Sequence, residues 1–226
     1  MSIANGGDTC WSLVGRAAAG DAPARSAFGR TYLPLMRAFL AARWRHSALL
    51  RELDDAVQET FVECFRPEGP LARADAARGD FRGFLFGIVR NIALRFEESA
   101  HKRRAHAEDA ASRLDSLPSQ DDQPSRAFDR EWAHTLMREA GELMRARADS
   151  AAARLRVELL SLRFGCGVSI HDIAAQWEMD AQAVHRAYAR ARDDFRSCLR
   201  HVVSYHAVRS EVDLDSECRR LFELLE

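Results

Sequence analysis

The stretch from Val168 to Arg200 constrains the fold of this chain most strongly, because it predicts two short helices joined by a tight connection. Ser169 and Asp180 each precede an apolar pattern of helical spacing, as residues that cap a helix N-terminus do. The apolar positions of the first helix are Ile170, Ile173, Ala174 and Trp177, and those of the second are Ala183, Val184, Ala187, Ala191 and Phe195. The pattern predicts a helix-turn-helix.

The second of these helices carries polar and basic residues off its apolar stripe. They are Gln182, His185, Arg186, Arg190, Arg192, Arg196 and Arg200. A helix that lies in the major groove of DNA needs a polar tip for base edges and cations for phosphates. The segment therefore favours DNA binding, and a packed helical hairpin with a solvated basic face is the alternative.

Length and composition fit two small domains or one medium domain, since 226 residues with 47% hydrophobic content can bury a core in each. No apolar run is long enough to span a bilayer and no export signal is evident, so we expect a cytoplasmic protein without membrane contact. The five cysteines form no CxxC pair, which fits a reducing compartment and predicts neither disulfides nor a metal site. Net charge is only −1, but the arginines cluster and Lys102 is the sole lysine.

No strand pattern appears along the chain, so the predicted fold is all-α, with two helical domains joined by a flexible linker. The second domain is the helix-turn-helix, which we expect to be winged-helix-like. The predicted segments are a flexible leader (1–24), a first domain (25–105), an acidic linker containing Ser and Pro (106–127), a second domain (128–203) and an extension with an amphipathic helix (204–226).

Two features of the first domain carry chemistry. The segment from Leu49 to Phe65 predicts a helix with an acidic edge, which is either solvated or faces a basic partner. The segment from Phe81 to Phe96 sets phenylalanines beside arginines, an arrangement that can hold unstacked bases. Most of these rings are assigned to the core, and Phe81 is the first candidate to face a base.

These motifs in this order resemble a bacterial sigma factor of the sigma-70 type, in the short extracytoplasmic-function group that keeps regions 2 and 4. The resemblance is carried by LDDAVQETFVECF (53–65), by FRGFLFGIVRNIALRF (81–96) and by the stretch from Val157 to Phe195. Together with the intervening helices these motifs cover most of the chain. Three ordered motifs are more specific than a single helix-turn-helix.

The resemblance implies a factor without catalytic residues, cofactor or metal, which lends promoter recognition to core RNA polymerase through the β′ clamp and the β flap. The residues implied to bind polymerase are Asp54, Asp55, Gln58, Glu59 and Glu63. Those implied to bind the minus-ten element of promoter DNA are Phe81, Arg82, Arg90, Asn91, Arg95, Lys102, Arg103 and Arg104. Those implied to read the minus-thirty-five element are Asp180, Gln182, His185, Arg186 and Arg190.

The chain departs from the family pattern at three positions. Phe84 stands where the family usually has tryptophan, Glu178 where the turn usually has glycine, and Ala187 where arginine is common. The extension 204–226 lies outside the minimal two-domain factor. It either regulates, by clamping the domains or by docking an anti-sigma factor or another regulator, or completes the core of the second domain.

Other classes of function remain open on the residues alone. A stand-alone helix-turn-helix regulator would explain the second domain, and an adaptor without DNA binding would explain Ala187. A metal-sensing tail would use Cys198, His201, His206 and Cys218, although their spacing matches no standard site. The sequence shows neither a nucleophile with a nearby base nor a phosphate-binding loop, so nothing in it indicates an enzyme.

Overall fold

The computed structural model describes residues 10–75, 80–107, 123–206 and 211–225, and for 104–107 and 211–213 it describes the backbone alone. Across these ranges every regular element is a helix, so the predicted all-α class is confirmed. The winged-helix-like expectation is wrong for these ranges, because a wing needs strands and the described residues form none. The contacts divide the chain into unit 1 (Met1–Ala133, Tyr205–Val208, Arg220–Glu226) and unit 2 (His134–Ser204, Arg209–Arg219).

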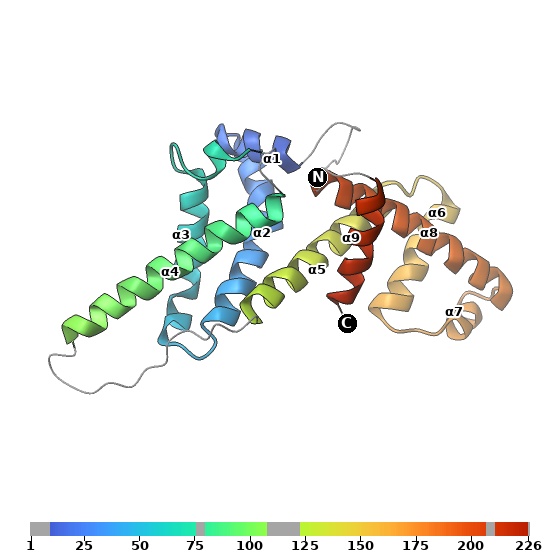
Figure 1. Cartoon of the computed structure of the whole chain (residues 1–226). Coiled ribbons are helices and arrows are strands. Elements are labelled where there is room, and N and C mark those ends of the chain that lie inside the picture. Colours follow the sequence, from blue (N-terminus) through green and yellow to red (C-terminus); the bar gives the residue numbers. More distant parts are fainter. Residues whose placement is uncertain (1–9, 76–79, 108–122, 207–210, 226) are drawn as a thin grey trace. The chain divides into compact units, whose positions relative to one another are not determined.

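Unit 1 is built around the long helix α2 (Ala22–Arg43). Its elements are α1 (Cys10–Ala18), α2 (Ala22–Arg43), the 3-10 turn η1 (Ala48–Glu52), α3 (Leu53–Phe65), the 3-10 turn η2 (Leu71–Arg73), α4 (Phe81–Ala107) and the start of α5 (Gln123–Ala146). Helix α2 contacts α1, α3 and α4 (Figure 1). Asp21 caps α2 by accepting a hydrogen bond from the Ala24 backbone N–H at 3.4 Å.

The predicted leader is wrong from Cys10 onward, because α1 is part of the core of unit 1. Its buried residues are Cys10, Leu13, Val14 and Ala17. Their spacing of three, one and three places them on one face of the helix. The glycines of this stretch suggested a loose segment, yet burial of that apolar face stabilises the short helix.

Rings from α1, α2 and α4 form the centre of the unit 1 core. The rings of Phe28 and Tyr32 on α2 have centroids 4.8 Å apart, and Phe81 on α4 lies 4.9 Å from Tyr32. Trp11 meets Phe81 edge-on at 5.5 Å. Edge-to-face pairs of this kind add to the stabilisation that comes from burial itself.

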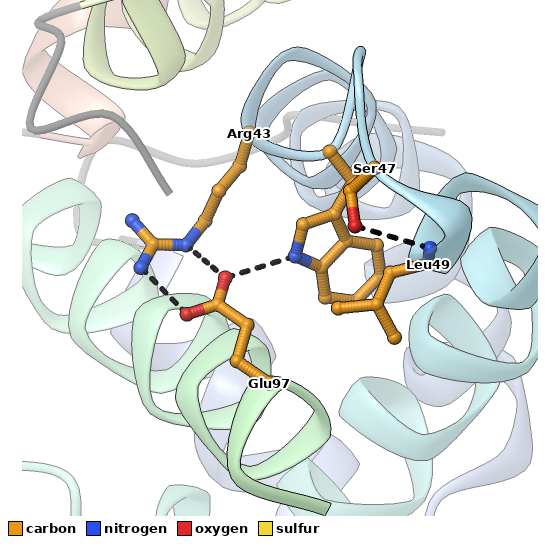
Figure 2. Close-up of polar contacts among 5 residues, drawn as sticks. Arg43, Ser47, Leu49 and Glu97 are labelled. Atoms are coloured by element: carbon orange, nitrogen blue, oxygen red, sulfur yellow. Dashed lines mark hydrogen bonds and ion pairs between the residues drawn. The ribbon is translucent and has the colours of Figure 1, made fainter. Parts of the chain in front are cut away.

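A polar junction joins the end of α2 to α4 (Figure 2). Arg43 donates from Nε to Glu97 Oε1 at 2.6 Å and from Nη2 to Oε2 at 2.9 Å, and Trp44 Nε1 donates to Oε1 at 2.9 Å. The next turn begins at Ser47, whose hydroxyl accepts from the Leu49 N–H at 3.2 Å. The two-pronged Arg43–Glu97 pair fixes direction as well as distance.

Two predicted boundaries differ from the structure. Helix α5 begins at Gln123, inside the predicted linker 106–127, and its residues up to Ala133 belong to unit 1. The part of the linker at 108–122 lies outside the described residues. The extension was expected either to regulate or to complete the second domain. Its residues are divided between the units, since Tyr205–Val208 and Arg220–Glu226 belong to unit 1 and Arg209–Arg219 belongs to unit 2. The amphipathic helix predicted there is α9 (Glu211–Glu223).

Unit 2 contains the pair of helices that the sequence predicts. Its elements are the rest of α5, α6 (Ala151–Leu160), a π-helical turn (Ser161–Gly165), α7 (Ile170–Gln176), α8 (Ala181–His206) as far as Ser204, and the first part of α9. Leu159, Ile173, Ala174 and Val184 form the buried core between α6, α7 and α8. The predicted helix pair therefore packs through the apolar stripe that defined it.

Both predicted caps are confirmed. Ser169 Oγ accepts from the Asp172 N–H at 3.1 Å at the start of α7, and Asp180 Oδ2 accepts from the Ala183 N–H at 2.9 Å at the start of α8. Each bond satisfies a backbone donor that has no partner within its own helix. The Ser169 cap fixes where α7 begins, and the Asp180 cap fixes where the connection ends and α8 begins.

Glu178 occupies the left-handed position of that connection, with φ of +52°. Helix α7 ends in a Schellman motif, in which the Met179 N–H donates to Ala174 O at 3.0 Å and the Glu178 N–H to Ala175 O at 3.3 Å. This position favours glycine because a Cβ crowds the following carbonyl. The departure noted at Glu178 is therefore a local strain that the rest of the turn tolerates.

We expect Glu178→Gly to raise the free energy of unfolding by about 1 kcal/mol, since relief of left-handed strain exceeds the added entropy of the unfolded chain. Glu178 is exposed, so no packing is lost with its side chain. Urea denaturation of the full chain measures the change. Glu178→Ala is the control and gives no gain, because alanine keeps the Cβ; a glycine variant no more stable than the alanine variant would contradict the assignment of strain.

Candidate functional site

The exposed side of α8 gathers the residues predicted to read bases. Gln182, His185, Arg186 and Arg190 are exposed, whereas Val184 and Ala191 are fully buried. Spacings of three and four place the exposed set on one side of the helix, away from the core. Ala187 is half-buried beside the core and lies at the edge of this side, where the sigma-factor pattern commonly has arginine. Together these four residues are called the α8 polar row.

Neighbouring arginines on α8 differ in how they are held. Arg192 lies over the Tyr188 ring at 5.9 Å, and Arg196 pairs with Asp193 at 3.1 Å. Arg186 and Arg190 have no ion pair within the part of the chain that the structure describes. Arg190 is therefore the better placed of these groups to meet a phosphate. Asp180, predicted with the row, uses its carboxylate to cap the helix that carries it.

Sequence reasoning missed one exposed aromatic residue in unit 2. Phe164 lies in the π-helical turn Ser161–Gly165 and is 73% exposed, with its ring centroid 6.4 Å from that of Tyr188. The sequence placed it at the end of an apolar helix, where the following glycines predict a turn. The only sequence signal of its exposure is that it follows Leu159 and Leu160, the last two buried residues of α6.

On α4 the predicted minus-ten residues fall into groups. Arg90 and Asn91 are exposed side by side, and Lys102 and Arg103 are exposed farther along the helix. The side chain of Arg104 lies outside the described residues. Asn91 presents an amide that can both donate to and accept from a base edge. This exposed part of α4, together with Arg95, is called the α4 basic face.

Two of the predicted minus-ten residues do not lie on that face. Phe81 is 0% exposed and packs among Trp11, Phe28 and Tyr32, so the expectation that it faces a base is wrong. It opens α4, where core contacts from α1 and α2 surround it. Arg82 donates to Asp129 of α5 from Nε at 3.1 Å and from Nη2, and both side chains are largely buried. Its guanidinium joins α4 to α5 and is not open to phosphate.

The acidic edge of α3 lies as the sequence predicts. Asp54, Asp55 and Gln58 are exposed, and Glu59 and Glu63 are half-buried. Val62, which the sequence analysis did not select, is 61% exposed among them. An apolar residue surrounded by carboxylates and an amide fits a partner surface that is basic with an apolar centre.

The cysteines show no reactive environment. Cys10, Cys64, Cys198 and Cys218 are buried and Cys166 is exposed, all as free thiols. Burial, and secondarily the charge of Glu63, raises the pKa of the Cys64 thiol to about 12, so it stays protonated at neutral pH. Within the described ranges no three His, Cys, Asp or Glu side chains gather as metal ligands, and the metal-sensing alternative finds no support there.

Comparisons with known proteins add no family to this picture. No protein-family model matches the chain, and no curated protein matches it. Separately, no helix in the described ranges has the length and apolar character that crossing a bilayer requires. Three exposed features of the chain bear on its function: the α8 polar row, the α4 basic face and the acidic edge of α3.

Proposed function

We propose that this chain is a sigma factor of the extracytoplasmic-function type, which binds core RNA polymerase in the cytoplasm and directs promoter-specific initiation of transcription. The observation that supports it most is in unit 1, where Arg90 and Asn91 are exposed on α4 while the neighbouring α3 exposes an acidic edge. A stand-alone helix-turn-helix regulator would use the α8 polar row and leave both unit 1 surfaces without a role.

In this proposal the α8 polar row reads the minus-thirty-five element. The Gln182 amide can bond a base edge with two atoms, and Arg186 can bond guanine in the same way. His185 lies between them on the exposed side, and Arg190 lies one turn farther along, where a groove-bound helix approaches the phosphates. The Asp180 cap fixes the start of the helix that presents this row.

The α4 basic face would engage the minus-ten element as single-stranded DNA. A base that leaves the stack exposes its Watson–Crick edge, which the Asn91 amide can bond, at an unstacking cost of a few kcal/mol. Arg90 would neutralise an adjacent phosphate. The acidic edge of α3, with the exposed Val62 near its C-terminal end, would dock on a basic surface of the polymerase β′ clamp, and the β flap would hold the second unit.

The α8 polar row predicts two kinds of variant. Arg190→Ala should weaken binding to all DNA sequences and lower the salt slope by about one, as loss of one phosphate contact does. Gln182→Ala or His185→Ala should relax sequence preference, at about 1–3 kcal/mol for the base concerned. Fluorescence anisotropy with matched and mismatched promoter duplexes measures both effects.

The control is Arg138→Ala, which removes an exposed arginine of α5 from unit 2 without touching the α8 polar row. Its affinity and salt slope should stay close to those of the parent chain. Equal losses on every sequence from Gln182→Ala, His185→Ala and Arg190→Ala would count against base reading by α8.

The proposed function is tested by co-purification of the full chain with core RNA polymerase, followed by run-off transcription from the DNA upstream of its own gene. Stable association with initiation at one position is the expected result. Duplex binding by the chain alone, without association with core polymerase, would replace the proposal with the stand-alone regulator. Association with polymerase without DNA binding would indicate the adaptor.

A further inference from the structure

Most carboxylates on the acidic edge of α3 and in the turn before it are paired with arginines of unit 1. Four carboxylates there, those of Glu52, Asp54, Glu59 and Glu63, each form an ion pair with an arginine. The arginines are Arg37 of α2, Arg66 directly after α3, and Arg95 and Arg103 of α4. Two of the cations assigned to DNA are thus held by carboxylates of the neighbouring helix, two of which are assigned to polymerase.

Arg95 is the clearest case. Its Nη2 donates to Glu59 Oε1 at 2.8 Å, and its Nη1 lies 3.6 Å from Glu63 Oε2. Both contacts join α4 to α3, so one guanidinium bridges two carboxylates that are one turn apart. A phosphate that approaches Arg95 therefore meets two negative charges beside it.

Arg103 repeats the arrangement two turns farther along α4. Its Nη2 donates to Glu52 Oε1 at 2.8 Å, across to η1. Arg90 and Asn91, by contrast, are exposed and have no ion pair within the described part of the chain. The α4 basic face is thus divided into an open part at Arg90 and Asn91 and a covered part at Arg95 and Arg103.

We propose that Glu59 and Glu63 of α3 mask Arg95, and that Glu52 of η1 masks Arg103, from nucleic acid in the free chain. A basic partner surface that binds these carboxylates then releases the two arginines to phosphate. This inference rests on the proposed function and deepens it, because it couples polymerase docking to DNA binding through shared ion pairs. By linkage the coupling is reciprocal, so bound DNA raises the affinity of the α3 edge for its basic partner by the same factor.

The size of the mask follows from the exposure of the pairs. The side chains of Arg95 and Glu59 are about half exposed, and exposed pairs of this kind are weak and are screened by salt. Release of one pair is therefore expected to tighten DNA binding by about two- to fivefold at low salt. A change of this size tunes promoter binding without abolishing it.

The test is a double-mutant cycle in the full chain, with a single-stranded mixed-sequence DNA oligonucleotide at low salt as the probe. Glu59→Gln removes one partner of Arg95, and the variants Arg95→Ala and Glu59→Gln/Arg95→Ala complete the cycle. Glu98→Gln is the charge-matched control, because Glu98 is exposed on α4 within one turn of Arg95 and forms no ion pair among the described residues. Anisotropy gives each dissociation constant.

The expected result is that Glu59→Gln tightens binding by about two- to fivefold, more than Glu98→Gln does, and that this gain disappears in the Arg95→Ala background. Equal gains from Glu59→Gln and Glu98→Gln, with Arg95→Ala still weakening binding, would overturn the mask while leaving α4 as the DNA surface. No loss of affinity for DNA when Arg95→Ala is added to Glu59→Gln, the background in which the arginine is released, would overturn the mask together with the assignment of Arg95 to DNA. The co-purification experiment tests the proposed function independently of both outcomes, because it uses the full chain with Glu59 and Arg95 unchanged.

Discussion

Replacement of His206 by alanine is expected to lower the free energy of unfolding of the chain by about 2–4 kcal/mol, because the imidazole is part of the unit 1 core. The residue is only 4% exposed. Its ring meets Trp132 at 5.1 Å, Tyr205 at 5.0 Å and Tyr32 at 6.2 Å, each near a right angle. Truncation leaves a cavity bounded by aromatic rings that cannot collapse to fill it.

Polar contacts add to this loss. His206 Nδ1 and the Tyr32 hydroxyl are 3.5 Å apart, and the Cys10 thiol donates to the His206 carbonyl oxygen at 3.8 Å. His206→Phe keeps an aromatic ring and removes the contact between Nδ1 and the Tyr32 hydroxyl, so it should cost about 1 kcal/mol. The difference between the alanine and phenylalanine variants separates packing from hydrogen bonding.

Urea denaturation followed by tryptophan fluorescence measures the effect, since Trp132 lies against the substituted ring. His134→Ala is the control, because His134 is an exposed residue two positions after Trp132 on α5. It should change stability by no more than about 0.5 kcal/mol. A His206→Ala variant as stable as the control would mean that the His206 side chain does not stabilise the core of unit 1.

Local sequence patterns were sufficient to predict the helices that have their own N-cap residue and one clear apolar stripe. Ser169, Asp180 and the apolar positions of α7 and α8 lie within a few residues of one another, so periodicity and capping fix both elements. The acidic edge of α3 followed in the same way from its spacing of three and four. In each case the forces that decide the structure act between near neighbours in the sequence.

Errors arose where distant residues decide the outcome. The contacts of His206 with Tyr32 and Cys10 span 174 and 196 residues, and no local pattern encodes them. Phe81 is buried because helices α1 and α2 cover it, and the sequence did not place α1 in the core. The pairing of Arg82 with Asp129 has the same origin. Whether an aromatic or basic residue near a DNA-binding motif faces DNA or lies in the core therefore depends on tertiary contacts, which composition does not reveal.

The α2–α4 junction in Figure 2 also depends on a distant partner, and Glu97→Ala is expected to destabilise unit 1 by about 3 kcal/mol. Glu97 accepts three hydrogen bonds, two from Arg43 and one from Trp44 Nε1. Its side chain and that of Arg43 are mostly buried, so removal of the carboxylate leaves a guanidinium with poor access to water. Trp44 itself is buried, and its indole N–H would lose its partner.

Four further variants, including the single variant Arg43→Ala, decide how that loss arises. Glu97→Gln keeps the shape and one acceptor, so about half the destabilisation should remain, whereas Glu98→Ala, at the exposed neighbouring position, should cost little. Arg43→Ala/Glu97→Ala removes both charges, and because the penalty of an unpaired cation is then absent, the double variant should be less destabilised than the sum of the single ones. Urea denaturation with Trp44 fluorescence measures each variant. Strictly additive losses would mean that Arg43 and Glu97 stabilise the junction separately, through packing and not as a pair.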